Sequence, residues 1–131
     1  MGLNQGVLFV CSHNSARSQM AEGFARFLGP AAIAVYSAGS APTTINPYAV
    51  AVMKEVGIDI SEQRSKGLDD VPLERIALVV TLCDAEVCPV VPGIQRLHRP
   101  LPDPAADPAL DPLPAFRRAR DQVRELISAL F

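Results

Sequence analysis

The segment from Cys11 to Ser18 combines residue types that can bind and attack an oxyanion. It reads Cys-Ser-His-Asn-Ser-Ala-Arg-Ser, so Arg17 follows the cysteine after five intervening residues. Small and polar residues let successive backbone N–H groups converge on one point and form an anion-binding nest. A planar guanidinium can grip two oxygens of the same anion. The predicted oxyanion-binding residues are Ser12, His13, Asn14, Ser15, Ala16, Arg17 and Ser18.

Cys11 is the predicted nucleophile of this segment. Converging N–H groups, a helix N-terminus and Arg17 all favour the thiolate, and the Ser18 hydroxyl can donate a further hydrogen bond to the sulfur. Asn14, which tolerates positive φ, can hold the shape of the loop. A cysteine and an arginine at this spacing also occur together by chance, as a buried thiol beside a surface arginine. The strand expected before the loop and the helix expected after it favour the catalytic interpretation.

Cys83 and Cys88 enclose four residues just after the most continuous apolar run, 76–82. The residues alone leave three interpretations open: a buried thiol with an incidental neighbour, a zinc site that includes His98 but lacks a convincing fourth ligand, and a redox pair. The redox interpretation accounts for all three cysteines. If residues 83–88 were helical, the two Cα atoms would lie roughly 8–9 Å apart, too far for a disulfide, which needs less than about 7 Å. Joining the two sulfurs would unwind that turn, so we predict that this segment is mobile.

Asp103 is a candidate general acid. It lies in Leu-Pro-Asp-Pro, a stretch stiffened on both sides, where a carboxylic acid held over the oxyanion could protonate a departing oxygen. Asp107 and Asp111 also precede prolines, and Asp-Pro is a common start of a turn. The pattern alone does not decide among the three.

Strands and helices must alternate to bring these residues together. Short apolar runs predict strands at 7–11, 33–37, 76–82 and 95–98. A stripe of Met20, Phe24, Phe27 and Leu28 predicts a helix that stops at Gly29, and further helices are expected over 47–57 and 116–130, after a proline-rich loop at 100–114. Alternation of this kind predicts a parallel sheet, at whose carboxyl edge ligands bind.

Length and composition predict one domain over residues 1–131, an α/β fold with a four-stranded parallel sheet flanked by helices on both faces. Hydrophobic residues make up 49% of the chain, enough to bury a core. A net charge of -2 offers no general attraction to nucleic acid or to a membrane surface. Without an apolar run that could span a membrane or serve as a signal sequence, we expect the chain in the cytoplasm. We also expect a monomer. In a reducing compartment an odd number of cysteines is not expected to form a structural disulfide framework.

Residues 7–23, VLFVCSHNSARSQMAEG, resemble the active-site loop of thioredoxin-coupled arsenate reductases, which share the fold of low-molecular-weight protein tyrosine phosphatases. The likeness continues through residues 36–39, 53–61, 79–83 and 103–105. It implies that the chain reduces arsenate to arsenite in arsenic resistance, with electrons from thioredoxin and no bound cofactor or metal. Cys11 and Arg17 then act on the oxyanion, Asp103 is the general acid, and Cys83 and Cys88 are the second and third redox cysteines.

Three departures from that family carry their own expectations. Fewer residues separate Cys83 from Cys88 than is usual, which leaves the final reductant open. Ala105 stands where the phosphatases have an aromatic residue that walls the pocket, which favours a small inorganic oxyanion. Lys66 stands at an aspartate of a potassium site found in some members, beside residues matching Asn14, Glu22 and Ser37, so we expect activity independent of potassium. The alternatives are a tyrosine phosphatase and, from another class, a non-catalytic metal or oxyanion sensor.

Overall fold

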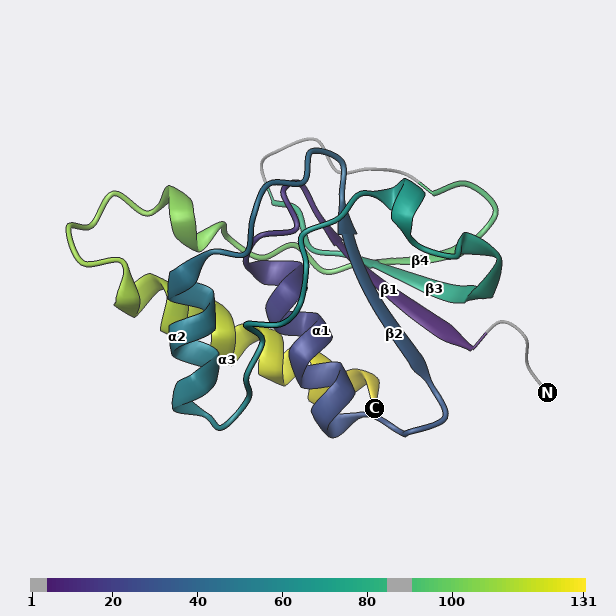
Figure 1. Ribbon diagram of the computed structural model, residues 1–131, viewed down its shortest axis with the longest axis horizontal. Coiled ribbons are helices and arrows are strands. Elements are labelled where there is room, and N and C mark those ends of the chain that lie inside the picture. The colour runs from purple at the N-terminus through teal and green to yellow at the C-terminus, as the bar shows by residue number, and fades with distance from the viewer. Residues whose placement is uncertain (1–4, 85–90) are drawn as a thin grey trace.

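The computed structural model describes residues 5–84 and 91–131 of the chain. Four parallel strands form one sheet in the order β2-β1-β3-β4 (Figure 1). The strands are β1 (Gly6–Cys11), β2 (Ala34–Gly39), β3 (Ile76–Thr81) and β4 (Gln95–His98). The α-helices are α1 (Arg17–Leu28), α2 (Pro47–Glu55) and α3 (Leu113–Leu130). Cys88 and most of the segment predicted to be mobile lie outside the described residues.

The three α-helices cover one face of the sheet (Figure 1). Phe9 and Val80 of the sheet pack there against apolar side chains of the helices, among them Phe24, Val52 and Phe116. The other face is covered by two 3₁₀ turns, η1 (Leu68–Asp70) and η2 (Leu73–Arg75), over a smaller cluster around Leu8, Val10, Ala38, Ile76 and Val79. The predicted four-stranded parallel sheet is confirmed, with the α-helices of the described residues on one face and only short 3₁₀ helices on the other.

Burial along the two central strands differs. All six residues of β1 are buried, as expected of a parallel strand with neighbours on both sides. In β3 the prediction of burial on both faces is right only for the second half, because Ala77 is exposed and Leu78 is half-buried. The cause is the short β4, which pairs only with Leu78–Thr81 and leaves the start of β3 on an open edge.

The predicted apolar stripe of α1 is buried at only two of its four residues. Met20 and Phe24 are buried against the sheet, whereas Phe27 is 67% exposed and Leu28 is 40% exposed. The buried residues of α1 end at Ala25, so its last turn extends past the packed region before the helix ends at Gly29, as predicted. Helical spacing alone does not show where a core stops.

The proline-rich segment after β4 is attached to the end of β3. Arg99 N–H donates to Thr81 O (2.9 Å), and Leu101 N–H donates to Leu82 O (3.2 Å). The loop predicted over 100–114 extends only to residue 112, because α3 already begins at Leu113, and a 3₁₀ turn, η3, spans Pro104–Ala106. These contacts carry Asp103 to the carboxyl edge of the sheet. Among the helices of the described residues, none is long and apolar enough to span a membrane.

Candidate active site

The loop between β1 and α1 is held against the segment that follows β2. Three of its carbonyls face the segment after β2, because Ser12 O, His13 O and Ser15 O accept hydrogen bonds from the N–H groups of residues 41, 43 and 46 (2.9, 3.2 and 3.0 Å). In a planar trans peptide the following N–H points the opposite way, so the N–H groups of residues 13, 14 and 16 face inward. Asn14 has a φ of +48°, which confirms the predicted left-handed position.

Gly39 at the end of β2 allows this loop to lie against the sheet. A Cβ atom at that position would lie 2.5 Å from Ser12 O and 2.8 Å from Asn14 N. Both are backbone atoms of the loop and cannot move away without deforming it. The glycine therefore sets how closely β2 and the loop approach one another.

Cys11 is a free thiol at the base of the loop, buried to 2% exposure. Its Sγ lies 2.8 Å from Ser18 Oγ, in the first turn of α1. The contact that the sequence predicted between the serine hydroxyl and the sulfur is thus present. Because Cys11 ends β1 and Ser18 lies in the first turn of α1, the sulfur sits where the N-terminus of α1 contributes partial positive charge.

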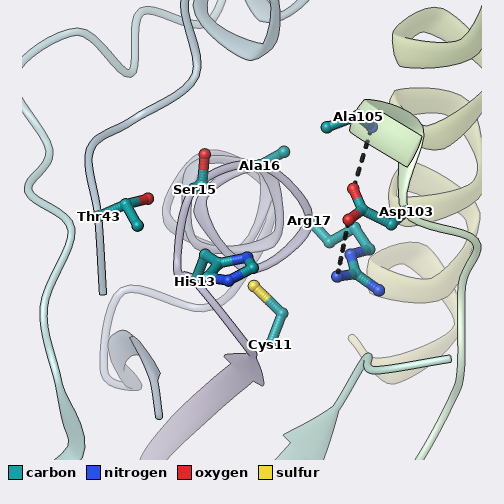
Figure 2. Close-up of a pocket in the computed structure, with 8 residues that line it drawn as sticks. All are labelled: Cys11, His13, Ser15, Ala16, Arg17, Thr43, Asp103 and Ala105. Carbon is teal, nitrogen blue, oxygen red and sulfur yellow. Dashed lines mark hydrogen bonds and ion pairs between the residues drawn. The ribbon is translucent and has the colours of Figure 1, made fainter. Parts of the chain in front are cut away.

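Arg17 is held by two segments that are distant in sequence. Its side chain is 3% exposed, and Nη1 donates to Leu82 O (3.3 Å) and to Leu101 O (3.1 Å). Nη2 lies 3.9 Å from Asp103 Oδ2 (Figure 2). A guanidinium anchored in this way is oriented before any anion binds.

Of the three aspartates that precede prolines, Asp103 is the one at the pocket (Figure 2). Its Oδ1 accepts a hydrogen bond from Ala105 N (3.0 Å), which caps η3 and orients the carboxyl group. Asp107 instead pairs with Arg118 (3.2 Å), and Asp111 accepts from the N–H of Leu113 (3.1 Å). The structure thus decides what the pattern left open.

The pocket over Cys11 has a volume of about 140 Å³. Pockets for drug-sized ligands span about 300–1,000 Å³, so this one suits a small anion. Four of the predicted oxyanion-binding residues line the pocket: His13, Ser15, Ala16 and Arg17. The other three, Ser12, Asn14 and Ser18, are buried and absent from its lining. The lining residues are Cys11, His13, Ser15, Ala16, Arg17, Thr43, Asp103 and Ala105 (Figure 2).

Thr43 is a lining residue that the sequence did not identify. It comes from the segment between β2 and α2, where its N–H donates to His13 O (3.2 Å) and to Ser65 Oγ (3.0 Å). Its position after β2 could have identified it as a pocket residue, because the loops that follow parallel strands lie at one edge of the sheet.

Cys83 lies next to Cys11 at this edge. Val10 pairs with Thr81, and Leu82 N–H donates to Val10 O (2.8 Å), so each cysteine follows directly on one partner of that hydrogen bond. Cys83 is buried and disulfide-bonded. Cys88 lies outside the described residues.

His98, the third residue of the zinc alternative, has its Nδ1 2.6 Å from Thr81 Oγ1. Within residues 5–84 and 91–131, no group of three histidine, cysteine or acidic side chains is arranged to hold a metal ion.

Behind the loop, Glu22 is a buried carboxylate with three partners. Ser37 Oγ donates to its Oε1, Lys66 Nζ lies 3.3 Å from the same oxygen, and Arg26 Nη2 lies 2.9 Å from Oε2. The backbone N–H of Lys66 also donates to Asn14 Oδ1 (2.8 Å). The ammonium of Lys66 therefore stands beside Glu22 and Ser37, with which the sequence analysis grouped it.

Comparisons with known proteins agree with this geometry. An arsenate reductase of Halalkalibacterium halodurans is 46% identical over 127 residues, which cover 92% of this chain and 91% of that protein. A solved structure of an arsenate reductase in the phosphate binding state matches with a TM-score of 0.83 and 40% identity, covering 96% of this chain and 95% of the other. A thioredoxin-dependent arsenate reductase of Corynebacterium glutamicum matches with a TM-score of 0.70 and 28% identity, covering 95% and 61%.

The family model for low molecular weight phosphotyrosine protein phosphatases matches residues 6–131. That range includes every strand and helix of the fold and every residue that lines the pocket. The chain belongs to the low molecular weight phosphotyrosine protein phosphatase family.

Proposed function

We propose that this chain reduces arsenate to arsenite through Cys11, Cys83 and Cys88, with electrons from thioredoxin. One observation carries the proposal: Cys11 ends β1 at the pocket that Arg17 and Asp103 line, and Cys83 lies two residues past the end of the adjacent strand β3, directly after the hydrogen bond from Leu82 N–H to Val10 O. A phosphatase needs one cysteine there, whereas a reductase needs a second sulfur within reach of the first. The names of the relatives support the same substrate.

The first step forms a bond between sulfur and arsenic. The inward N–H groups and Arg17 hold the arsenate oxygens, and the Cys11 thiolate attacks arsenic. Asp103 supplies the proton with which a hydroxyl group leaves as water. Arsenic remains As(V) in the adduct on Cys11.

The second step transfers two electrons. Once thioredoxin has reduced the disulfide at Cys83, the Cys83 thiolate attacks Cys11 Sγ, so a disulfide forms while the sulfur–arsenic bond breaks. The electron pair of that bond stays on arsenic, which leaves as arsenite. Two thiols are oxidised and As(V) is reduced to As(III), so the electrons balance.

The third step regenerates the nucleophile. Cys88 attacks Cys83 Sγ and releases the Cys11 thiolate, and thioredoxin then reduces the disulfide between Cys83 and Cys88 by dithiol exchange. All three sulfurs belong to one chain, so we propose a monomer that needs no bound cofactor. We place it in the cytoplasm, where thioredoxin keeps thiols reduced.

The test is arsenate turnover with thioredoxin, thioredoxin reductase and NADPH. We expect Cys11→Ser and Cys83→Ser to abolish turnover, and Cys88→Ser to allow about one turnover per chain before it stops. Ser61→Ala, a substitution of an exposed serine outside the site, is the matched control. Multiple turnovers by Cys88→Ser with thioredoxin would show that the relay is wrong, and stoichiometric zinc in an inactive parent would favour the sensor alternative.

The family model favours a second candidate, hydrolysis of a phosphate ester by the same first step. Ala105 leaves that side of the pocket without an aromatic wall, so we expect only weak activity on aryl phosphates. The Cys83→Ser variant distinguishes the two functions. We expect it to lose arsenate reduction and to keep aryl phosphate hydrolysis. Hydrolysis of an aryl phosphate much faster than arsenate reduction in the parent would make the chain a phosphatase.

A further inference from the structure

Gln19 is a fully buried amide of α1 that does not line the pocket. Its Nε2 donates to Arg64 O (2.7 Å) and to Asn14 Oδ1 (2.8 Å). Its Oε1 accepts from Gln63 Nε2 (2.8 Å). The side chain therefore joins residues 63–64, more than forty positions away in sequence, to the loop that holds Cys11.

Two backbone groups fix the orientation of the side-chain amides of Gln19 and Asn14. A carbonyl can only accept, so Arg64 O requires the nitrogen of the Gln19 amide to face it. A backbone N–H can only donate, so the N–H of Lys66 (2.8 Å) requires the oxygen of the Asn14 amide to face it. Neither amide can be rotated by half a turn without setting like groups against each other.

The fixed orientation of Asn14 decides the direction of the last hydrogen bond. With Oδ1 occupied by Lys66 and Gln19, Asn14 Nδ2 faces Ser18 and donates to its Oγ (2.8 Å). The Ser18 hydroxyl accepts there, so its single hydrogen is left for Cys11 Sγ, 2.8 Å away. A hydrogen bond donated to sulfur stabilises the thiolate and not the thiol.

We propose that Gln19 is a positioning residue that, together with the backbone of residues 64–66, orients Asn14 so that Ser18 donates to Cys11. The inference rests on the proposed function only in taking Cys11 as the nucleophile. It goes further by assigning a chemical task to residues that touch neither the anion nor the sulfur.

The first test is Gln19→Glu, which replaces the Nε2 donor by an oxygen facing three acceptors: Arg64 O, Asn14 Oδ1 and Asn14 O. The relief available is rotation of the Asn14 amide, which gives up the hydrogen bond from the N–H of Lys66, presents Oδ1 to Ser18 and draws the hydroxyl hydrogen away from the sulfur. The assay is the rate of Cys11 alkylation by iodoacetamide against pH, assigned to Cys11 by peptide mass spectrometry. We expect the midpoint of the profile to rise by about one pH unit, which makes the reaction about tenfold slower at a pH below both midpoints.

The plateau of that profile distinguishes positioning from damage to the fold. At high pH the sulfur is ionised in both proteins, so the limiting rate should match the parent. A lowered plateau with an unchanged midpoint would overturn the proposal. Gln95→Glu, which adds a carboxylate at an exposed glutamine of β4, is the matched control and should leave both values unchanged.

A double-mutant cycle with Ser18→Ala separates the hydrogen bond from the added negative charge. If Gln19 acts through Ser18, Gln19→Glu shifts the midpoint in the parent and causes no further shift in Ser18→Ala. An equal shift in both backgrounds would mean that the charge acts through space, and the proposal would be wrong.

Gln19→Met is the second variant, in case a buried glutamate prevents folding. It removes both donors without adding charge, and the Lys66 N–H still holds Asn14 Oδ1, so we expect a smaller shift in the same direction. No shift in Gln19→Met would overturn the proposal. Alkylation uses no arsenate, so a chain without reductase activity could still confirm the role of Gln19.

Discussion

Replacement of Lys66 by methionine tests whether an ammonium takes the place of a bound cation. Lys66 Nζ lies 3.3 Å from Glu22 Oε1, and the two side chains are 13% and 4% exposed. Removing one partner of a buried ion pair typically costs about 3–5 kcal/mol. Arg26 remains on Glu22 at 2.9 Å but is 57% exposed, so it compensates only partly. We expect Lys66→Met to lower the free energy of unfolding by about 2–3 kcal/mol in sodium buffer.

Potassium should then restore part of what the substitution removes. The space beside Glu22 and Ser37 is lined by oxygens once the ammonium is gone, so a potassium ion can bind there and neutralise the carboxylate. The assays are urea unfolding and arsenate turnover in potassium and in sodium salts at equal ionic strength. We expect Lys66→Met to gain stability and activity in potassium, and the parent and Lys54→Met, which alters an exposed lysine of α2, to gain neither.

Two results would refute this reasoning. Stimulation of the parent by potassium over sodium would show that Lys66 leaves room for the ion. A Lys66→Met protein as stable as the parent in sodium would show that the ammonium does not neutralise Glu22.

Three further predictions concern other parts of the structure. Asp103→Asn should lower kcat for arsenate by about 10²–10⁴-fold with an unchanged melting temperature, measured by initial rates and calorimetry, because the amide cannot supply the proton. Gly39→Ala should lower the free energy of unfolding by about 1–3 kcal/mol in urea titration, since its Cβ would lie 2.5 Å from a backbone oxygen of the loop. Hydrogen bonding from Arg117, with a further contribution from Arg120, lowers the pKa of Glu55 below its ordinary value of 4.5. The pairing therefore stabilises the fold above that pH and is lost as the pH falls through the lowered pKa, so the difference in melting temperature between the parent and Glu55→Gln should shrink in acid.

The sequence predicted the parts of the site that local patterns encode. Cys11 and Arg17 stand at the two ends of one loop, between a strand predicted by a continuous apolar run and a helix predicted by an apolar stripe, so chain connectivity brings them together. The strand at 95–98 was also predicted correctly, because its length and place match a short edge strand.

The remaining contributions depend on contacts between distant segments. Gln19 carries no signal in sequence, because a buried glutamine cannot be told from an exposed one until its partner at Arg64 is known. Thr43 joins the pocket only through the bond of its N–H to His13 O. The Asp-Pro pattern alone did not separate Asp103 from Asp107; the family resemblance favoured Asp103, and the structure shows that it faces Arg17.

The end of β3 explains how the proposed relay can proceed without loss of the anion site. Leu82 is held at both of its backbone groups: its N–H donates to Val10 O, and its carbonyl accepts from Arg17 and from the N–H of Leu101. The residues up to Leu82 are therefore part of the rigid edge that orients the guanidinium. In the proposed relay Cys83 exchanges one sulfur partner for another, which requires the chain to move. Because Leu82 is held in place, that movement can begin only after Leu82. A single backbone position thus separates the part of the chain that must stay still for binding from the part that must move for reduction.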